Sequence, residues 1–385
     1  MKVCVPREIR EGEKRVALVP DVISKLKKLG YEVVIESGAG VHSQAPDDQY
    51  TAAGATVSSG DVISGADVVL SVQPLTPAQM AKLKKGAVTI SFLSPTTAID
   101  SIEASASAGA TSLSMELIPR ISRAQSMDAL SSQALCAGYR AALVGAELSP
   151  RFFPLLMTAA GTVTPAQVLV LGAGVAGLQA IATARRLGAV VSAYDVRPAS
   201  ADEVRSMGAT FIQLELEALE GAGGYAREMT EERAAKQREL LTPYIAKSHV
   251  VITTAAVPGR TAPRLMTQDM VDAMEPGTII IDLAAETGGN VEGSKPGEIV
   301  ETAGGVRIWG GKDVPSQLPF HASSLYSRNV VNLLTLMTKA AAPAKDDKPA
   351  TALSIDINFD DEIINGATVT HGGARRSPQD AKAAK

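Results

Sequence analysis

Short runs of β-branched and aliphatic residues alternate with segments of helical pattern along almost the whole chain. The segment DVISKLKKLG, for example, has apolar residues at helical spacing and ends in glycine. Strands that alternate with helices in this way form a parallel sheet with helices on both faces. The sequence therefore predicts an α/β fold with doubly wound parallel sheets. The first series of predicted strands is KVCV, YEVVIES, DVVLSVQ, AVTISFL and TSLSMEL.

A second series of the same kind follows a long predicted helix from Ser126 to Leu148. We expect a later helix, from about Ser323 to Lys339, to return to the first domain. These features predict two domains, one of residues 1–125 with 316–385 and one of residues 126–315. The predicted strands of the second series are QVLVL, VVSAYD, ATFIQL, HVVITTA and TIIIDLA.

The C-terminal segment has a different character. Residues 340–350, AAAPAKDDKPA, have the composition of a linker. The following segment, TALSIDINFDDEIINGATVTH, alternates with period two around Asn365-Gly366 and predicts a C-terminal β-hairpin. We expect the last residues, SPQDAKAAK, to be disordered.

Composition and charge exclude several classes of protein. The 385 residues include 37 basic and 41 acidic side chains, for a formal charge of −4, and we find no basic stripe that would predict a nucleic-acid partner. Cys4 and Cys136 lie far apart in sequence and predict neither a disulfide framework nor a metal site. No apolar run reaches the ~18–20 residues of a membrane helix. The charged N-terminus does not resemble a signal peptide.

The segment GAGVAG, residues 172–177, matches the pattern GxGxxG between an apolar strand and a helix, which is the context that the pattern requires. Gly172 permits a tight turn, Gly174 lets the backbone approach a pyrophosphate, and Gly177 allows close packing of helix on strand. The start of the helix then offers free N–H groups and partial positive charge to phosphates. We interpret the segment as a dinucleotide site in a Rossmann-like domain, the alternative being a structural turn without a ligand.

Asp195, at the end of the next predicted strand, indicates which dinucleotide binds. A carboxylate there accepts hydrogen bonds from the adenosine ribose and repels a 2′-phosphate, which favours NAD(H) over NADP(H). Arg197 leaves NADP(H) open, because an arginine accommodates that phosphate.

Two further segments are candidates for ligand contact. Glycines flank Tyr225 in a long connection, which is typical of a flap that closes on a ligand, although a plain exposed connection fits the pattern equally well. In RISRAQSMDALSSQ, Arg120 to Gln125 should be a loop after a strand end, and Asp128 and Ser131 share a helix face. Such a set could orient a flat amide-bearing ring, whereas helix capping and surface charge are the alternative.

These segments, together with IDLAAETGGN, resemble the NAD(H)-binding component of proton-translocating nicotinamide nucleotide transhydrogenase. The resemblance extends from KVCVPRE to about Lys339 and implies two Rossmann-like domains around a cleft, paired in a homodimer. It implies that Arg120, Gln125, Asp128, Ser131 and Tyr225 act in catalysis, with Gln125 reaching toward a second nucleotide on a partner. The cofactor contacts that it implies are Arg120, Ile121, Ser122, Gln125, Leu130, Ser131, Gly172, Ala173, Gly174, Val175, Gly177, Asp195, Val196, Arg197, Gly224, Gln237 and Ala256.

Alanine dehydrogenase, a member of the same superfamily, is the rival interpretation. Oxidising an amino acid requires a general base and a cation for the carboxylate. A lysine and a histidine in alanine dehydrogenases correspond here to Gln73 and Ser94, whereas Arg15 is common to both groups. Hydride transfer between two nicotinamides needs no proton acceptor, so the loss of these groups favours a transhydrogenase. A regulatory NAD(H)-sensing module is a third hypothesis.

The resemblance thus predicts reversible hydride transfer from NADH on this chain to NADP⁺ on a partner component. It also implies coupling to proton flow through a membrane component, and a cytoplasmic location at the inner membrane through these partners. Many members continue into membrane helices in the same chain. We expect the membrane and NADP(H)-binding parts to be separate polypeptides here, with a shortened chain as the alternative.

Overall fold

The computed structural model describes residues 1–216, 230–257, 259–339 and 352–376. The chain forms two compact units, which are described separately. Unit 1 comprises residues 1–133 and 316–385, and unit 2 comprises residues 134–315. Tyr225, Gly224, the predicted linker 340–350 and the predicted tail 377–385 lie outside the described residues.

The sheet of unit 1 has the strand order β19-β18-β6-β5-β4-β1-β2-β3. Strands β1 to β6 are parallel, and the order reverses between β1 and β4, as in a doubly wound fold. The antiparallel strands β18 and β19 extend the edge beside β6. The bounds are β1 Lys2–Val5, β2 Glu32–Glu36, β3 Thr56–Ser58, β4 Val68–Leu70, β5 Val88–Ser91, β6 Thr111–Ser114, β18 Thr368–His371 and β19 Ala374–Arg375.

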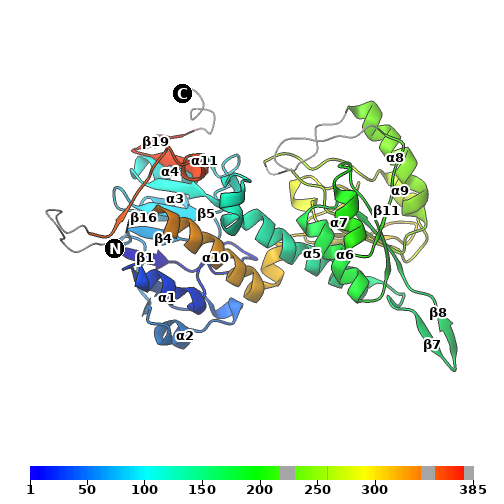
Figure 1. Ribbon diagram of the computed structural model, residues 1–385, viewed down its shortest axis with the longest axis horizontal. Helices are drawn as coiled ribbons and strands as arrows, with labels where there is room; N and C mark the ends of the chain where they lie inside the picture. Colours follow the sequence, from blue (N-terminus) through cyan, green and yellow to red (C-terminus); the bar gives the residue numbers. More distant parts are fainter. Residues whose placement is uncertain (217–229, 258, 340–351, 377–385) are drawn as a thin grey trace. The chain divides into compact units, whose positions relative to one another are not determined.

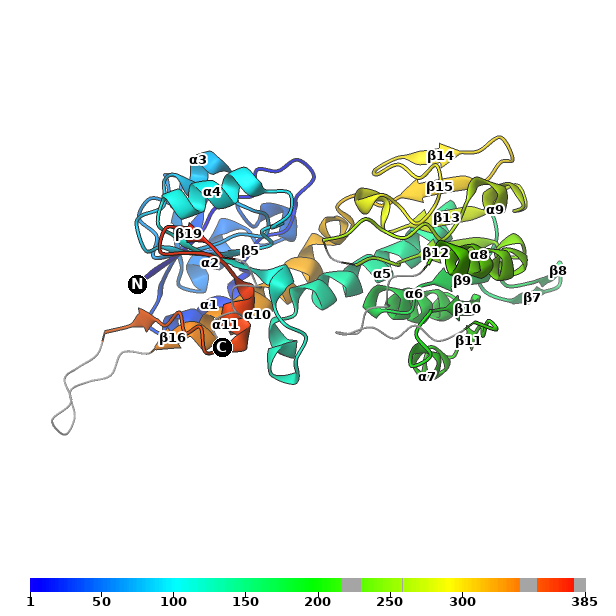
Figure 2. The same cartoon turned by 90° about the horizontal axis from the view of Figure 1, so that it is seen from above.

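Helices cover both faces of this sheet, with α3 and α4 on one side and α1 and α10 on the other (Figure 2). The strands are apolar runs because side chains that alternate along each strand enter opposite cores. Ile23 and Leu333 pack in one core, and Met80 and Ile102 pack in the other. The bounds are α1 Pro20–Lys28, α2 Asp47–Ala52, α3 Pro77–Met80, α4 Ile99–Ser107, α10 Pro319–Met337 and α11 Glu362–Ala367.

The sheet of unit 2 repeats this topology in the order β11-β10-β9-β12-β13-β15-β14, with its edge strand β14 antiparallel to β15 (Figure 2). Val168 and Val170 face one core, whereas Leu169 and Leu171 face the other. The strands are β9 Gln167–Leu171, β10 Val190–Tyr194, β11 Thr210–Phe211, β12 Val250–Thr253, β13 Ile279–Asp282, β14 Ile299–Glu301 and β15 Arg307–Gly310. The helices are α6 Val175–Arg186, α7 Ser200–Ser206, α8 Glu231–Ala246 and α9 Gln268–Asp272, and α5, Ala129–Leu148, runs into the unit from its N-terminal side.

Two small antiparallel ribbons complete the described elements. A hairpin of β7, Leu156–Thr158, and β8, Gly161–Val163, projects from unit 2 (Figure 1). In unit 1, β16, Thr338–Lys339, pairs with β17, Ser354–Ile355. The sequence pattern does not predict either ribbon. Within the described residues, every helix is too short or too polar to cross a membrane.

The C-terminal hairpin is present, but the predicted position of its turn is wrong. Asn365-Gly366 lies inside α11 rather than in a turn, because Asp361 caps that helix by accepting the N–H of Ile363. The C-terminal hairpin forms instead between β18 and β19, around Gly372 and Gly373, both of which have positive φ.

The predicted boundary between loop and helix near Ser126 is also shifted. Residues Ser122–Met127 form a 3₁₀ helix, η3, and α5 starts at Ala129. Asp128 marks this start, because its carboxylate accepts the N–H of Ser131 at 2.8 Å and thereby caps the first turn.

Candidate functional site

The turn between β9 and α6 is built by three glycines with different surroundings. Gly172 has φ +100°, and a Cβ there would lie 2.6 Å from Thr254 Oγ1. A Cβ at Gly177 would lie 1.8 Å from the carbonyl oxygen of Gly172, so only glycine lets α6 pack this closely on the turn. A Cβ at Gly174 would meet no atom within 4 Å, which leaves open space in front of the N-terminus of α6.

This turn lies at the point where the strand order of unit 2 reverses, between β9 and β12. Thr254, directly after β12, donates from Oγ1 to the carbonyl of Gly172 at 3.0 Å. In open α/β sheets, ligands bind outside the carboxyl ends of strands at such a reversal. The unpaired N–H groups at the start of α6 favour an anion there.

Asp195, directly after β10, is joined to the same turn. Its carboxylate accepts the N–H of Ala173 at 2.7 Å and the N–H of Arg197 at 2.9 Å. The guanidinium of Arg197 donates to both carboxylate oxygens, each at 2.9 Å, and this pairing raises the pKa of Arg197. The carboxylate is therefore neutralised locally by an arginine of its own loop.

The remaining predicted contacts of unit 2 have contrasting environments. Val175 and Ala256 are exposed, and Val196 is half-buried. Gln237, on α8, is instead buried, and its Oε1 accepts a hydrogen bond from Tyr194, the residue before Asp195. In this structure Gln237 thus supports the strand that carries Asp195.

Sequence reasoning assigned no role to two buried residues that shape this site. The carboxylate of Asp282, at the end of β13, accepts the hydroxyl of Thr253 and three backbone N–H groups of residues 284, 290 and 291. The amide of Asn290 pairs with both backbone groups of Ala255, next to Ala256. Both side chains lie in the segment IDLAAETGGN, whose polar ends were the available signal.

The polar loop predicted to contact the ring lies in unit 1. Arg120, Ser122 and Gln125 are exposed, whereas Ala124 and Met127 are buried in the core. Ile121 and Leu130, two further predicted contacts, are half-buried.

Two side chains of this loop are engaged locally. Asp128 accepts the hydroxyl of Ser131 at 2.6 Å, in addition to the capping bond. Arg123 donates to both carboxylate oxygens of Asp361, at 2.6 and 2.9 Å, and this pairing lowers the pKa of Asp361. The loop is therefore fastened to the C-terminal segment of the chain.

A hydrogen-bonded network in unit 1 joins Arg15, Glu13 and Gln73. Arg15 donates to both oxygens of Glu13, at 2.8 and 2.6 Å, and to Gln133 at 2.9 Å. Burial would raise the pKa of Glu13, but the hydrogen bonds and charge of Arg15 outweigh it and lower that pKa to about 2. Gln73 donates to Glu13 at 2.6 Å and accepts from Arg10 at 2.9 Å. Arg15 is thus neutralised by an internal carboxylate.

Glu8 and Ser94 of unit 1 are also held by backbone hydrogen bonds. Glu8 accepts the N–H groups of Val72 and Gln73, and burial raises its pKa to about 7. Ser94 has φ 48° and donates its N–H to Glu116 at 2.6 Å. Ser94 therefore lies in a tight turn that Glu116 stabilises.

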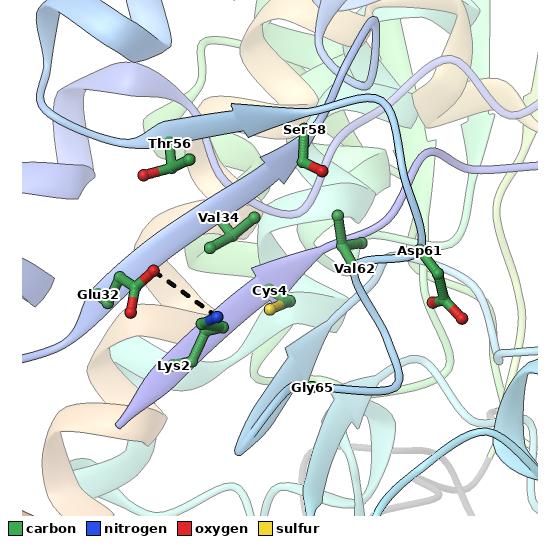
Figure 3. Close-up of a pocket in the computed structure, with 9 residues that line it drawn as sticks. All are labelled: Lys2, Cys4, Glu32, Val34, Thr56, Ser58, Asp61, Val62 and Gly65. Atoms are coloured by element: carbon green, nitrogen blue, oxygen red, sulfur yellow. Dashed lines mark ion pairs between the residues drawn. The ribbon is translucent and has the colours of Figure 1, made fainter.

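A small cavity of about 200 Å³ opens beside β1, β2 and β3 of unit 1 (Figure 3). Its floor includes the thiol of Cys4, and its rim includes an ion pair of Lys2 with Glu32 at 3.8 Å. Burial raises the pKa of Cys4 to about 11, which favours the protonated thiol at neutral pH. Within the described residues, no group of three or more His, Cys, Asp or Glu side chains could hold a metal ion.

Comparison with known proteins defines the class of this chain. Residues 4–137 match the family described as alanine dehydrogenase/PNT, N-terminal domain, and residues 141–377 match alanine dehydrogenase/PNT, C-terminal domain. The chain therefore belongs to the alanine dehydrogenase/PNT family.

Within this family, the chain is more similar to transhydrogenases than to alanine dehydrogenases. An NAD(P) transhydrogenase alpha-subunit polypeptide of Rhodospirillum rubrum is 49% identical over 384 residues, which cover 97% of each chain. The crystal structure of the transhydrogenase from Sinorhizobium meliloti superposes with a TM-score of 0.87 at 44% identity, and covers 98% of this chain and 100% of that one. Alanine dehydrogenase of Mycobacterium tuberculosis is 32% identical over 301 residues, which cover 77% of this chain and 76% of the relative.

The glycine geometry leads to a prediction about stability. Gly177→Ala would force the Gly172 carbonyl or α6 to move and should lower the free energy of unfolding by about 1–3 kcal/mol or more, the cost of an overpacked contact. Gly174→Ala is the matched control, since its methyl group would enter open space. Chemical denaturation of both variants measures the difference, and equal stability of the two would contradict the close packing at Gly177.

Proposed function

We propose that this chain is the NAD(H)-binding subunit of a proton-translocating NAD(P)⁺ transhydrogenase. The observation that supports this most strongly is the 49% identity to a transhydrogenase subunit over nearly the whole of both chains. The glycine turn at a strand reversal, joined to Asp195, supports a dinucleotide site in unit 2. We also propose that the chain has two domains, with the boundaries 125/126 and 315/316 that the sequence predicts.

In this proposal, the pyrophosphate binds at the start of α6, over Gly172, Ala173, Gly174 and Val175. Asp195 binds the adenosine ribose, with Val196 and Arg197 beside it, so the dinucleotide is NAD(H). Arg197 would then rotate from the carboxylate, or share it, as the ribose hydroxyls bind. Gly224, Gln237 and Ala256 complete the proposed contacts.

Loop 120–128 and the first turn of α5 hold the nicotinamide end in this proposal. Their proposed contacts are Arg120, Ile121, Ser122, Gln125, Asp128, Leu130 and Ser131. The cofactor supplies the chemistry, which is the transfer of a hydride from its reduced ring to an oxidised nicotinamide. Asp128 and Ser131 orient the ring, Gln125 faces the acceptor, and Tyr225 helps to exclude water. Because a hydride carries its own electron pair, the chain need not remove a proton.

The acceptor in this proposal is NADP⁺ on a separate component, and proton translocation takes place in a membrane component. The chain would be cytoplasmic and bound to the inner membrane through these partners. The Glu13–Arg15–Gln73 network supports this assignment over an amino-acid dehydrogenase, because an uncharged glutamine, bonded to Glu13 and Arg10, stands where the resemblance places the dehydrogenase lysine.

We further propose that the protein is a homodimer, and the β7–β8 hairpin supports this. All residues of both strands are exposed, and Met157 and Phe152 are 76% and 61% exposed. An isolated two-stranded hairpin is only marginally stable in water, so an apolar one requires a covering surface.

The homodimer can be tested at this hairpin. Met157→Glu should raise the dimer dissociation constant by roughly tenfold or more, since it places a charge on an apolar contact. Met207→Glu, at an exposed apolar residue that directly follows α7, is the control. Sedimentation equilibrium over a range of concentrations measures both. A dimer of unchanged affinity in Met157→Glu would show that the hairpin is not the contact.

The function itself is tested by mixing. The chain, mixed with an NADP(H)-loaded transhydrogenase partner component, should reduce an NAD analogue, and Gln125→Asn should slow this transfer strongly while NADH affinity stays nearly unchanged. Oxidation of alanine without a partner would establish a dehydrogenase instead. NADH binding with no transfer to the partner would favour a regulatory module. An equally large loss of affinity in Gln125→Asn would make Gln125 an ordinary NAD contact.

The ribose assignment is tested separately. Asp195→Ala should weaken NADH binding by about 1–3 kcal/mol, the scale of a lost charged hydrogen-bonding partner. Titration calorimetry with NADH and with NADPH measures this. Because Asp195 also accepts the N–H of Ala173, the thermal midpoint of each variant should be measured as a control for turn stability. Unchanged NADH affinity would contradict the assignment.

A further inference from the structure

We propose that Asn329, on helix α10, is a positioning residue for hydride transfer, because its amide sets the conformation of loop 120–128. The inference rests on the proposed function, since it concerns how that loop presents Gln125 and Asp128. Asn329 is separated from the loop by 203 residues of sequence but lies beside it in unit 1.

Both polar atoms of the Asn329 amide form hydrogen bonds. Its Nδ2 donates to the carbonyl of Ser126 at 3.0 Å, and its Oδ1 accepts the hydroxyl of Ser132 at 2.7 Å. The side chain therefore bridges η3 and the first turns of α5. The proposed function places the nicotinamide ring against Gln125, Asp128 and Ser131, and these residues lie between or beside the two ends of this bridge.

Burial favours one orientation of the Asn329 amide. Asn329 is only 7% exposed, so water competes little for its amide. Exchange of its oxygen and nitrogen would place a donor against the Ser132 hydroxyl and an acceptor against the Ser126 carbonyl. The latter contact would be repulsive, so one amide orientation and one loop position are favoured.

A second asparagine on the same helix provides an internal comparison. Asn332 donates to the same carbonyl of Ser126 at 3.1 Å, and its own oxygen accepts from Lys25 at 2.8 Å. Its bonds lie at the surface, where water can replace them, and it makes no bond to α5 among those described. Asn332 therefore binds the same Ser126 carbonyl as Asn329 but does not link it to Ser132.

The position of Ser126 explains why this bridge matters for transfer. Ser126 follows Gln125 directly, and Ser132 follows Ser131. A shift of the Ser126 carbonyl would therefore move Gln125 relative to the helix cap at Asp128. Hydride transfer is steeply sensitive to such displacements, because the two rings must approach to about 3–3.5 Å.

The experiment compares Asn329→Ala with Asn332→Ala in the transfer assay with the NADP(H)-loaded partner component. Asn329→Ala should slow transfer roughly 10- to 100-fold, the scale of a misplaced reacting group, with NADH affinity changed less than about threefold. Asn332→Ala should transfer at nearly the rate of the unaltered chain. Asn329→Asp, which keeps the size and the acceptor but removes the donor, serves if the alanine variant does not fold.

A double-mutant cycle separates positioning from general support. If Asn329 acts through the loop, Asn329→Ala should slow transfer much less in a Gln125→Asn background than alone. Equal effects in both backgrounds, or equal rates for Asn329→Ala and the unaltered chain, would overturn the inference while leaving the proposed function intact. Absence of transfer by the unaltered chain would instead overturn the proposed function, and the inference with it.

Discussion

The close approach of α6 to the end of β9 is the contact on which the site of unit 2 depends. Because Gly177 has no side chain, the helix can begin directly over the carbonyl of Gly172. That carbonyl is then free to accept Thr254 from the adjacent β12, and Ala173 donates to Asp195 at the end of β10. One missing methyl group thus lets the ends of three neighbouring parallel strands join in a single polar edge. The helix N-terminus, which favours anions, faces the same edge.

Unit 1 has the same kind of strand order but uses its strand ends differently. There, Glu13 pairs with Arg15 and also accepts from Gln73, so the buried charges compensate one another internally. Buried charges of this kind are tolerated only when each is paired and hydrogen-bonded. A carboxylate substrate would have to displace Glu13 from Arg15.

The sequence predicts most strands of both sheets, because a parallel strand buried on both faces is an apolar run bounded by turns. The glycine spacing also anticipates the tight packing at Gly177. The sequence prediction fails at two places. The 3₁₀ helix Ser122–Met127 has no distinct periodicity, and the period-two alternation around Asn365-Gly366 predicts a turn although Asp361 caps a helix there.

The support of the candidate site could not be predicted from the sequence alone, because it depends on contacts between distant segments. Asn329 reaches Ser126 across 203 residues, and Asn290 reaches Ala255 across 35. No local motif encodes such pairs. Conversely, Gln237 follows from a family resemblance as a cofactor contact, but in this structure its Oε1 is bonded to Tyr194.

The discontinuity of unit 1 also has a consequence for biosynthesis. Loop 120–128 is translated early, but Asn329 and Asp361, which bond to it, are translated only after the whole of unit 2. Domains generally fold as units while the chain leaves the ribosome. Unit 2 can therefore complete its sheet while this loop still lacks its anchors. The bonds that anchor this loop can therefore form only after the whole chain of unit 2 has been translated.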